Sequence, residues 1–281
     1  MNFRIGIKPS ILLILIATSF QSLALGPTTA SNAHFSATND YQANQPTNSH
    51  ISLKGEDVRV IAYKEFHAGV TAYKAGQFDL AALLFSDSLA GLSASGTLLN
   101  LGLAEWRTGK SGAAILAWEQ SAYLNPFDVS AQENLSFARD IIFVNQPELS
   151  RCELASTWLP ASWWAWLACG SLWVAVGMMT LPGFFRLPKS NWHQTLAALS
   201  LGIFILSLAP NYGVMTRATI GIIVEKNTAL RLTPTRSAAS ITLLSAGEPI
   251  RQLRVRGEYI FVHSQSGNGW IKLQQVKFIS P

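Results

Sequence analysis

The sequence predicts a multi-domain membrane protein, in which an all-α helical repeat and a small all-β barrel flank two transmembrane helices. Asp, Glu, Lys and Arg make up 13% of the 281 residues, about half of the roughly 25% usual in soluble domains. The deficit lies in two windows, residues 158–185 and 190–216, which lack these four residue types altogether. A pattern of small and aromatic residues repeats over 62–126, and short β-prone segments fill 218–281. This composition excludes a wholly cytosolic enzyme and a disordered chain, and two cysteines exclude a disulfide framework.

The N-terminus predicts export. Arg4 and Lys8 precede an apolar run over 11–17, and small residues occupy positions −3 and −1 before a cleavage point after Ala24. This is the pattern of a secretory signal peptide over residues 1–24. The alternative is an uncleaved membrane anchor, and the absence of a nearby cysteine excludes a lipoprotein. Residues 25–55 are rich in Asn, Thr, Ser, Gln and Ala, which predicts a disordered linker.

A spacing of 33 residues relates two neighbouring segments. Three kinds of residue recur at this interval: small residues where paired helices touch, a glycine that ends the first helix, and an aromatic residue that fills the gap to the next unit. This recurrence predicts two helix–turn–helix units. The units span about 62–94 and 95–127, and the segment 128–144 predicts a capping helix. The related pairs are Gly69 and Gly102, Tyr73 and Trp106, Gly76 and Gly109, Ala81 and Ala114, and Phe85 and Trp118.

These residues resemble the tetratricopeptide repeat. The resemblance is clearest from Asn100-Leu101-Gly102 through Ala114 and Trp118 to Pro126. Two units and a cap fall below the roughly three repeats usually needed for independent stability. We therefore expect an extra helix, a partner or the membrane to support the array. The sequence departs from the repeat's pattern at Ser93, Glu105 and Ser121.

A relaxed phosphate-loop pattern occurs at Ala104 to Ser111. Phosphate binding at such a loop requires a preceding strand and a Gly-rich turn at a helix N-terminus. Here the preceding residues are predicted to be helical, and the glycine is a repeat position. We interpret the segment as the turn between two helices.

Two transmembrane helices are predicted, at 158–181 and at 192–210. Tryptophans crowd the start of the first, which suits a lipid–water interface; a ligand-stacking site is the alternative. The connecting loop, 182–191, carries Arg186 and Lys189 and no acid, which places it in the cytoplasm. Both flanking domains then lie outside, in agreement with the signal peptide. No Asp, Glu, Lys or Arg lies within either span, so a transporter is not expected.

The C-terminal segment 218–281 predicts a small barrel of short strands. It resembles the bacterial SH3-like domain, most specifically at Gly267-Asn268-Gly269-Trp270. We expect Tyr259, Phe261 and Trp270 to line a ligand groove, the alternative being that Trp270 supports the barrel. The expected strands are Ile220–Val224, Ala229–Leu232, Ile241–Leu244, Ile250–Val255, Tyr259–His263 and Gly269–Lys272.

The two outer domains differ in charge. Residues 51–157 hold 8 Lys and Arg against 12 Asp and Glu, a net charge of −4, whereas 217–281 hold 9 against 3, a net charge of +6. Opposite charges favour docking of one domain on the other, and the basic domain also suits anionic lipid or wall polymer. Two independent solvated surfaces are the alternative. Nucleic acid is not expected as a partner, because the basic residues are scattered and the domain is exported.

No residue pattern predicts catalysis, a metal site or a cofactor. Cys152 and Cys169 lie beside and within the first span, so they form neither a redox pair nor a metal site. The acidic residues of the repeat occupy positions where a charged outer surface is usual. The five histidines, His34, His50, His67, His193 and His263, are far apart in the sequence and form no metal-binding motif.

The order of the whole chain is similar to that of the BatE-type proteins of bacterial Bat (aerotolerance) operons. Residues 98–102, Asn125-Pro126 and Asn134-Leu135 resemble them most. The resemblance implies a place in the bacterial inner membrane beside von Willebrand A-domain Bat proteins and a MoxR-type ATPase, in stress or oxygen tolerance.

The first functional hypothesis is therefore a non-enzymatic adaptor that holds a protein partner outside the membrane. In tetratricopeptide arrays the first helix of each unit lines the binding groove. The second hypothesis is a peptidoglycan receptor that acts through the SH3-like domain, and the third is a signal-relaying protein. Tyr73 and Trp106 can also be packing residues. The predicted groove residues are His67, Val70, Tyr73, Lys74, Asn100, Leu103, Trp106, Arg107 and Arg139.

Overall fold

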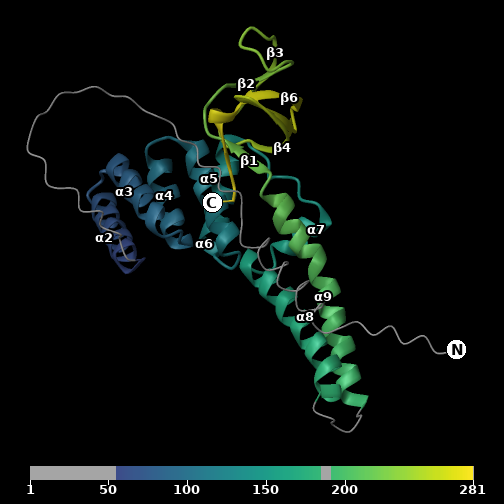
Figure 1. Cartoon of the computed structure of the whole chain (residues 1–281). Coiled ribbons are helices and arrows are strands. Elements are labelled where there is room, and N and C mark those ends of the chain that lie inside the picture. Colours follow the sequence, from purple (N-terminus) through teal and green to yellow (C-terminus); the bar gives the residue numbers. More distant parts are fainter. Residues whose placement is uncertain (1–54, 185–190, 281) are drawn as a thin grey trace, which may run out of the picture. The chain divides into compact units, whose positions relative to one another are not determined.

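The computed structural model describes residues 55–184 and 191–280 (Figure 1). The described chain runs from a helical region through two long apolar helices to an antiparallel sheet, and these three parts confirm the predicted order. The expected signal peptide (1–24), nearly all of the linker (25–55) and the loop residues 185–190 lie outside the described residues.

Helices α2 to α6 form the first part, and each packs on the next along the chain. Helix α6 covers nearly all of the expected capping segment, and Phe143 ends it with a left-handed backbone conformation. Asp128 begins it by accepting a hydrogen bond from the backbone N–H of Ser130. The bounds are Gly55–Lys74 (α2), Phe78–Gly91 (α3), Ser95–Arg107 (α4), Ser111–Leu124 (α5) and Val129–Ile142 (α6).

Equivalent contacts recur 33 residues apart in the two helical pairs. A Cβ atom on Gly69 would lie 2.8 Å from the Phe85 ring, and one on Gly102 would overlap the Trp118 indole. Both aromatic side chains are almost fully buried. The turn between the paired helices contains Gly76 in one unit and Gly109 in the other, with φ of 77° and 78°.

A hydrogen bond also recurs at this interval. The Ser88 hydroxyl donates to the carbonyl of Ala62 at 2.7 Å, and the Ser121 hydroxyl donates to the carbonyl of Ser95 at 2.9 Å. The departure from the expected pattern at Ser121 therefore has a structural reason. Its hydroxyl joins the end of α5 to the start of α4, as Ser88 does for α3 and α2.

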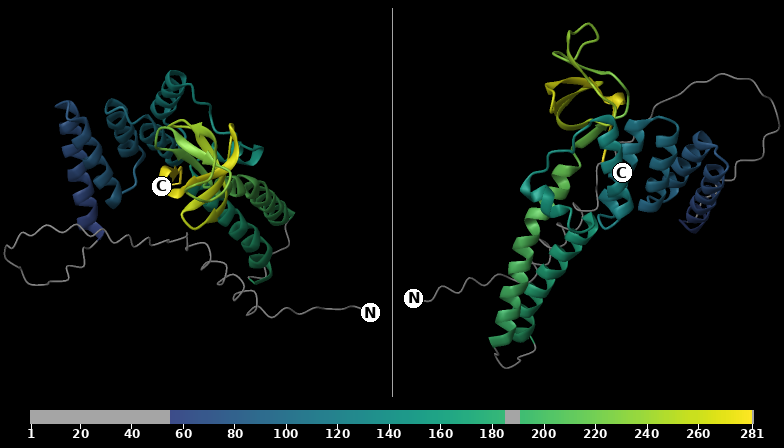
Figure 2. Two further views of the ribbon diagram at one scale, coloured as in Figure 1. Left: turned by 90° about the horizontal axis from the view of Figure 1, so that it is seen from above. Right: turned by 180° about the vertical axis from the view of Figure 1, so that it is seen from behind.

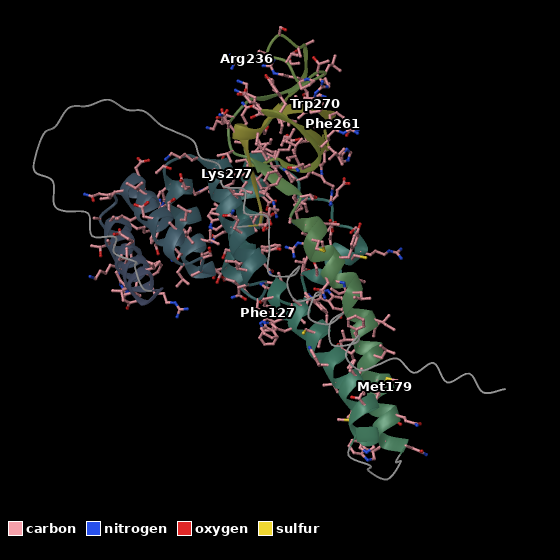
Figure 3. The ribbon with its side chains drawn as sticks, viewed as in Figure 1. Phe127, Met179, Arg236, Phe261, Trp270 and Lys277 are labelled. Atoms are coloured by element: carbon pink, nitrogen blue, oxygen red, sulfur yellow. The ribbon has the colours of Figure 1, made fainter. Side chains whose placement is uncertain are left out.

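Two long helices follow, α8 (Ala161–Phe184) and α9 (Asn191–Arg217), and they lie side by side in both views (Figures 1 and 2). Each is long and apolar enough to cross a membrane. Large apolar side chains along them stay exposed, among them Trp166 and Leu206. Met179 on α8 is another, and Figure 3 labels it. Small residues, including Ala197, are buried where the two helices meet.

Helix α9 continues for two turns past Pro210, where the sequence predicted its end. Proline has no N–H to donate within the helix. Next to Pro210, the side-chain amide of Asn211 donates to the backbone carbonyl of Ser207 at 2.9 Å and to the backbone carbonyl of Trp164 in α8 at 3.0 Å. These bonds hold the two helices together where the backbone ladder is weakened. A short helix that was not predicted, α7 (Arg151–Ser156), packs against the last turns of α9.

The C-terminal part is a seven-stranded antiparallel sheet in the order β3-β2-β6-β5-β4-β1-β7. A core of aliphatic residues that includes Leu230, Ile260 and Ile271 is buried within it. A 3-10 turn and strand β7 at the C-terminus were not predicted. The strands are Ile220–Ile223 (β1), Thr228–Arg231 (β2), Ser240–Leu244 (β3), Pro249–Arg256 (β4), Tyr259–Ser264 (β5), Gly267–Lys272 (β6) and Val276–Phe278 (β7).

A shared apolar core joins the helical region to the sheet. Ile115 and Trp118 of α5 and Leu135 of α6 pack with Ile222 of β1 and Ile279. The helical region thus receives from the sheet the support that two repeat units and a cap were expected to need.

We expect Gly102→Ala to lower the free energy of unfolding by about 2 kcal/mol, because the added methyl group overpacks a buried contact. Trp118 cannot withdraw freely, since its indole N–H donates to the Leu99 carbonyl at 3.2 Å. Gly96→Ala in the same helix meets no atom within 4 Å and should change stability by less than about 1 kcal/mol. Urea unfolding of the full chain in detergent micelles measures both. Equal effects of the two substitutions would contradict the packing role of Gly102.

Candidate functional site

The predicted groove residues of the first unit lie on α2. His67 and Lys74 are exposed, and the His67 ring stacks edge-on against Tyr63 with centroids 4.3 Å apart. Val70 and Tyr73 are half-buried beside the small core of α2, α3 and α4. Tyr73 also contacts Phe78 at the start of α3, with centroids 5.2 Å apart. Of the predicted residues of this unit, His67 and Lys74 are therefore the exposed ones.

The predicted residues of the second unit lie on α4 and are more deeply engaged. Trp106 is half-buried between Trp118 and Phe137, with ring centroids at 5.9 and 6.1 Å. Leu103 packs against the same core. The Asn100 amide donates to the Gly96 carbonyl of its own helix at 2.8 Å.

Two predicted cationic residues have different surroundings. Arg107 is exposed, and its guanidinium carbon lies 5.5 Å from the centroid of the Phe78 ring at the start of α3. Arg139 of α6 instead forms a largely buried ion pair with Glu119 of α5. The first-helix surface thus presents His67, Lys74 and Arg107, whereas Arg139 joins two helices.

The predicted aromatic residues of the sheet lie on β5 and β6. The rings of Phe261 and Trp270 are half-buried and 5.2 Å apart (Figure 3). Tyr259 is buried, and its hydroxyl has no hydrogen-bond partner among the described residues. Phe261 and Trp270 therefore form the accessible pair, and Tyr259 lies beneath the surface.

Strand pairing extends this pair into a row across four strands. Arg231 is opposite Trp270, Trp270 is opposite Phe261, and Phe261 is opposite Arg254. Directly opposed residues of antiparallel strands lie on one face of the sheet. The row thus has an aromatic pair at its centre and an arginine at each end.

A second row on the same face consists of Lys272, Tyr259 and Arg256. Neither row contains an acidic residue. Arg254, Arg256 and Lys272 have no ion-pair partner among the residues that the structure describes. We refer to Arg231, Arg254, Arg256, Lys272, Phe261 and Trp270 as the basic aromatic face.

The parts of the chain meet at a buried carboxylate. Glu153 of α7 is 1% exposed, and the guanidinium of Arg251 on β4 donates to its two oxygens at 2.7 and 3.0 Å. The N–H of Ser150 donates to the same carboxylate at 2.7 Å. Burial alone would raise the pKa of Glu153, but these hydrogen bonds outweigh it and lower the pKa from 4.5 to about 2.

A second cation joins the helical region to the same place. The guanidinium carbon of Arg217, the last residue of α9, lies 5.0 Å from the centroid of the Tyr123 ring on α5. Arg217 also donates to the Ser156 hydroxyl of α7 at 3.4 Å. Burial raises the pKa of the Tyr123 phenol, although the charge of Arg217 opposes that rise. We call Tyr123, Glu153, Ser156, Arg217 and Arg251 the junction cluster.

Sequence reasoning missed the junction cluster and the cations of the basic aromatic face. One local signal was present, because Ser150 and Glu153 have the spacing of a capping box, and the structure forms it. The spacing of Arg254 and Arg256 also fits one face of a strand. Nothing local in the sequence pairs Glu153 with Arg251.

Comparison with known proteins gives no relative for this chain: no protein-family model, no curated protein and no solved structure matches it. Within the described residues, no group of three or more His, Cys, Asp and Glu side chains is arranged to hold a metal ion.

We expect Glu153→Gln to lower the stability of the full chain by about 3 kcal/mol at neutral pH, because it removes the charge that Arg251 binds. The folded-state pKa of Glu153 is depressed below its ordinary value. The stability that the ionised side chain contributes is therefore fully present above pH 4.5 and is lost as the pH falls toward about 2. The difference in the free energy of unfolding between wild type and variant should therefore shrink over that pH interval. Urea unfolding in detergent micelles at several pH values measures it.

Glu148→Gln is the matched control. Glu148 is exposed, and Arg251 bonds only its backbone carbonyl, at 3.0 Å. This substitution should leave stability nearly unchanged. A Glu153→Gln variant as stable as wild type at pH 7 would show that the ion pair does not stabilise the junction cluster.

Proposed function

We propose that the protein is a non-enzymatic adaptor of the bacterial inner membrane, whose helical repeat holds a protein partner on the extracytoplasmic side. The observation that carries the proposal is the repetition of the same packing contacts 33 residues apart in two helical pairs. Such arrays present the first helix of each unit as a continuous binding surface. Here that surface offers the exposed side chains of His67, Lys74 and Arg107.

We assign the helical pairs to the tetratricopeptide type and the sheet to the bacterial SH3-like barrel. The paired glycine and aromatic contacts support the first assignment, and the β5–β6 hairpin that holds Gly267, Gly269 and Trp270 supports the second. With two membrane spans between them, this order resembles the BatE-type proteins. The proposed partners are accordingly membrane-bound von Willebrand A-domain Bat proteins.

The proposed topology places both terminal parts outside the cytoplasm. Helices α8 and α9 pack along one another, so the chain leaves the pair at the end where it entered. Arg186 and Lys189 in the connecting loop favour the cytoplasm for the opposite end. Exposed tryptophans, Trp158, Trp163 and Trp166, lie near the start of α8, as at a lipid–water interface.

Site-specific crosslinking in native membranes tests the partner surface. A photoreactive amino acid at Lys74 or at Arg107 should form an adduct with the same protein, because both side chains lie exposed on first helices. The same amino acid at Asp87 is the control, since Asp87 is exposed on α3, a second helix. Charge reversal of Lys74, with the probe at Arg107, should lower the yield several-fold. Equal adducts at Asp87, or none at any position, would contradict the proposal.

The basic aromatic face favours a second function, a receptor for anionic cell-wall polymer. Aromatic rings stack on sugar rings, and unpaired Arg and Lys side chains bind carboxylate or phosphate groups. The face combines both features on adjacent strands, as the cross-strand rows show.

Sedimentation with purified peptidoglycan tests this second function. Arg254→Glu with Arg256→Glu should reduce co-sedimentation of the detergent-solubilised full chain at least about tenfold, as expected where two charge-assisted contacts are lost. The control is Lys226→Glu with Lys277→Glu, which changes the net charge equally at exposed positions outside the face. If both double variants bind equally, attraction depends on net charge alone and the face is not a binding site.

A further inference from the structure

The corner between α5 and α6, residues 125–129, exposes apolar side chains that the other described residues leave uncovered. Phe127 is 63% exposed and Val129 is 62% exposed. The polar residues of the corner are engaged locally: the Asn125 side chain accepts from the Phe127 N–H, and Asp128 caps α6. Phe127 and Val129 thus place two exposed apolar side chains, two residues apart, at the tip of the corner.

The junction cluster brings this corner close to the point where α8 and α9 emerge. Arg217 at the end of α9 touches both Tyr123 and Ser156. Phe127 follows Tyr123 by four residues, and Trp158, which is 69% exposed, follows Ser156 by two. The three exposed apolar residues Phe127, Val129 and Trp158 are therefore held near one guanidinium by short stretches of chain.

Helix geometry sets the height of the corner relative to the membrane. About 20 helical residues cross the hydrocarbon layer, so a span that begins at Asn191 leaves it near Asn211. Asn211 bonds the carbonyl of Trp164, whose indole N–H donates to the Ser156 carbonyl at 3.2 Å. From Asn211 to Arg217 the helix rises about 9 Å, which brings Arg217 to the outer edge of the headgroup region. Tyr123 lies at the level of Arg217.

The direction of α5 turns the corner toward the bilayer. Gly112 at the start of α5 lies against the backbone of Ile223 and Val224 in the sheet, and Tyr123 near its end lies against Arg217. The chain therefore runs from the sheet toward the membrane as it approaches Phe127. Helix α6 then runs back toward the sheet, since Ile142 at its end lies beside Gly247.

We infer that the corner between α5 and α6 is a lipid-binding surface, in which Phe127 and Val129 insert into the headgroup region beside Trp158. The inference rests on the proposed membrane topology. Aromatic and aliphatic side chains at this depth gain free energy by leaving water, and the interface also accommodates the indole N–H of Trp158. The helical repeat is then attached to the membrane at two places, the junction cluster and this corner, which fixes its orientation to the bilayer.

Depth-dependent fluorescence quenching tests the inference on the full chain in nanodiscs that contain nitroxide-labelled phosphatidylcholine. In a background with Cys152 and Cys169 replaced, single cysteines at 127, 129, 143 and 173 carry an environment-sensitive fluorophore. Phe143 is the matched control, because it is 93% exposed at the opposite end of α6. The 14 residues of α6, which separate Phe127 from Phe143, correspond to about 21 Å along the helix axis. Position 173 reports on α8 inside the hydrocarbon.

Labels at 127 and 129 should be quenched by headgroup-proximal nitroxide at least about twofold more than the label at 143. The label at position 127 replaces the Phe127 side chain, whereas the label at position 129 reports on the corner while Phe127 is still present. Quenching at 173 without quenching at 127 and 129 would overturn the inference and leave the membrane assignment intact. No quenching at 173 would instead refute the membrane assignment, and the inference with it. Equal quenching at 127 and 143 would also overturn the inference, because α6 would then lie flat on the lipid.

Discussion

The ionised side chain of Glu153, buried where three parts of the chain meet, is the interaction on which the arrangement depends. A carboxylate removed from water costs several kcal/mol unless other groups supply charge and hydrogen bonds. Its partners come from α7 itself and from Arg251, which is 98 residues away on β4. Glu153 is therefore stabilised only when α7 and the sheet have come together beside the end of α9. Because Glu153 is costly to bury without its partners, it favours the one arrangement of α7, the sheet and α9 in which those partners are present.

Close backbone approach supplies the second constraint, and glycine makes it possible at two places. Gly213 of α9 faces the backbone of Cys152 in α7, and Gly112 of α5 faces the backbone of Ile223 and Val224. A side chain at either position would meet main-chain atoms, which cannot move aside as a flexible side chain can. Helix α5 thus meets the sheet, and α9 meets α7, by direct backbone packing, while the ion pair of Glu153 and Arg251 joins α7 to β4.

Local periodicity made much of this fold predictable. The 33-residue spacing predicted the helical pairs because each contact, such as Gly102 on Trp118, depends on residues within one unit. Six of the seven strands were predicted to within a few residues for a similar reason. The basic aromatic face was not predicted, because its cations lie on β2, β4 and β6 and only the strand pairing brings them beside Phe261 and Trp270. The junction cluster was missed because its partners are far apart in sequence and show no shared pattern.

The distribution of contacts has a mechanical consequence for an adaptor. Helix α5 touches the sheet through Gly112 and the end of α9 through Tyr123, so the second helical pair is held at both ends. Among the described residues, α2 and α3 pack on each other and on α4, and their small core around Phe85 is separate from the core shared with the sheet. A partner bound at His67 and Lys74, as proposed, would therefore pull on the less supported pair. The load passes through α4 to Trp118 and α5, and from α5 through Tyr123 to Arg217. The packed aromatic residues Trp118 and Tyr123 thus connect the exposed surface of the helical pairs to α9.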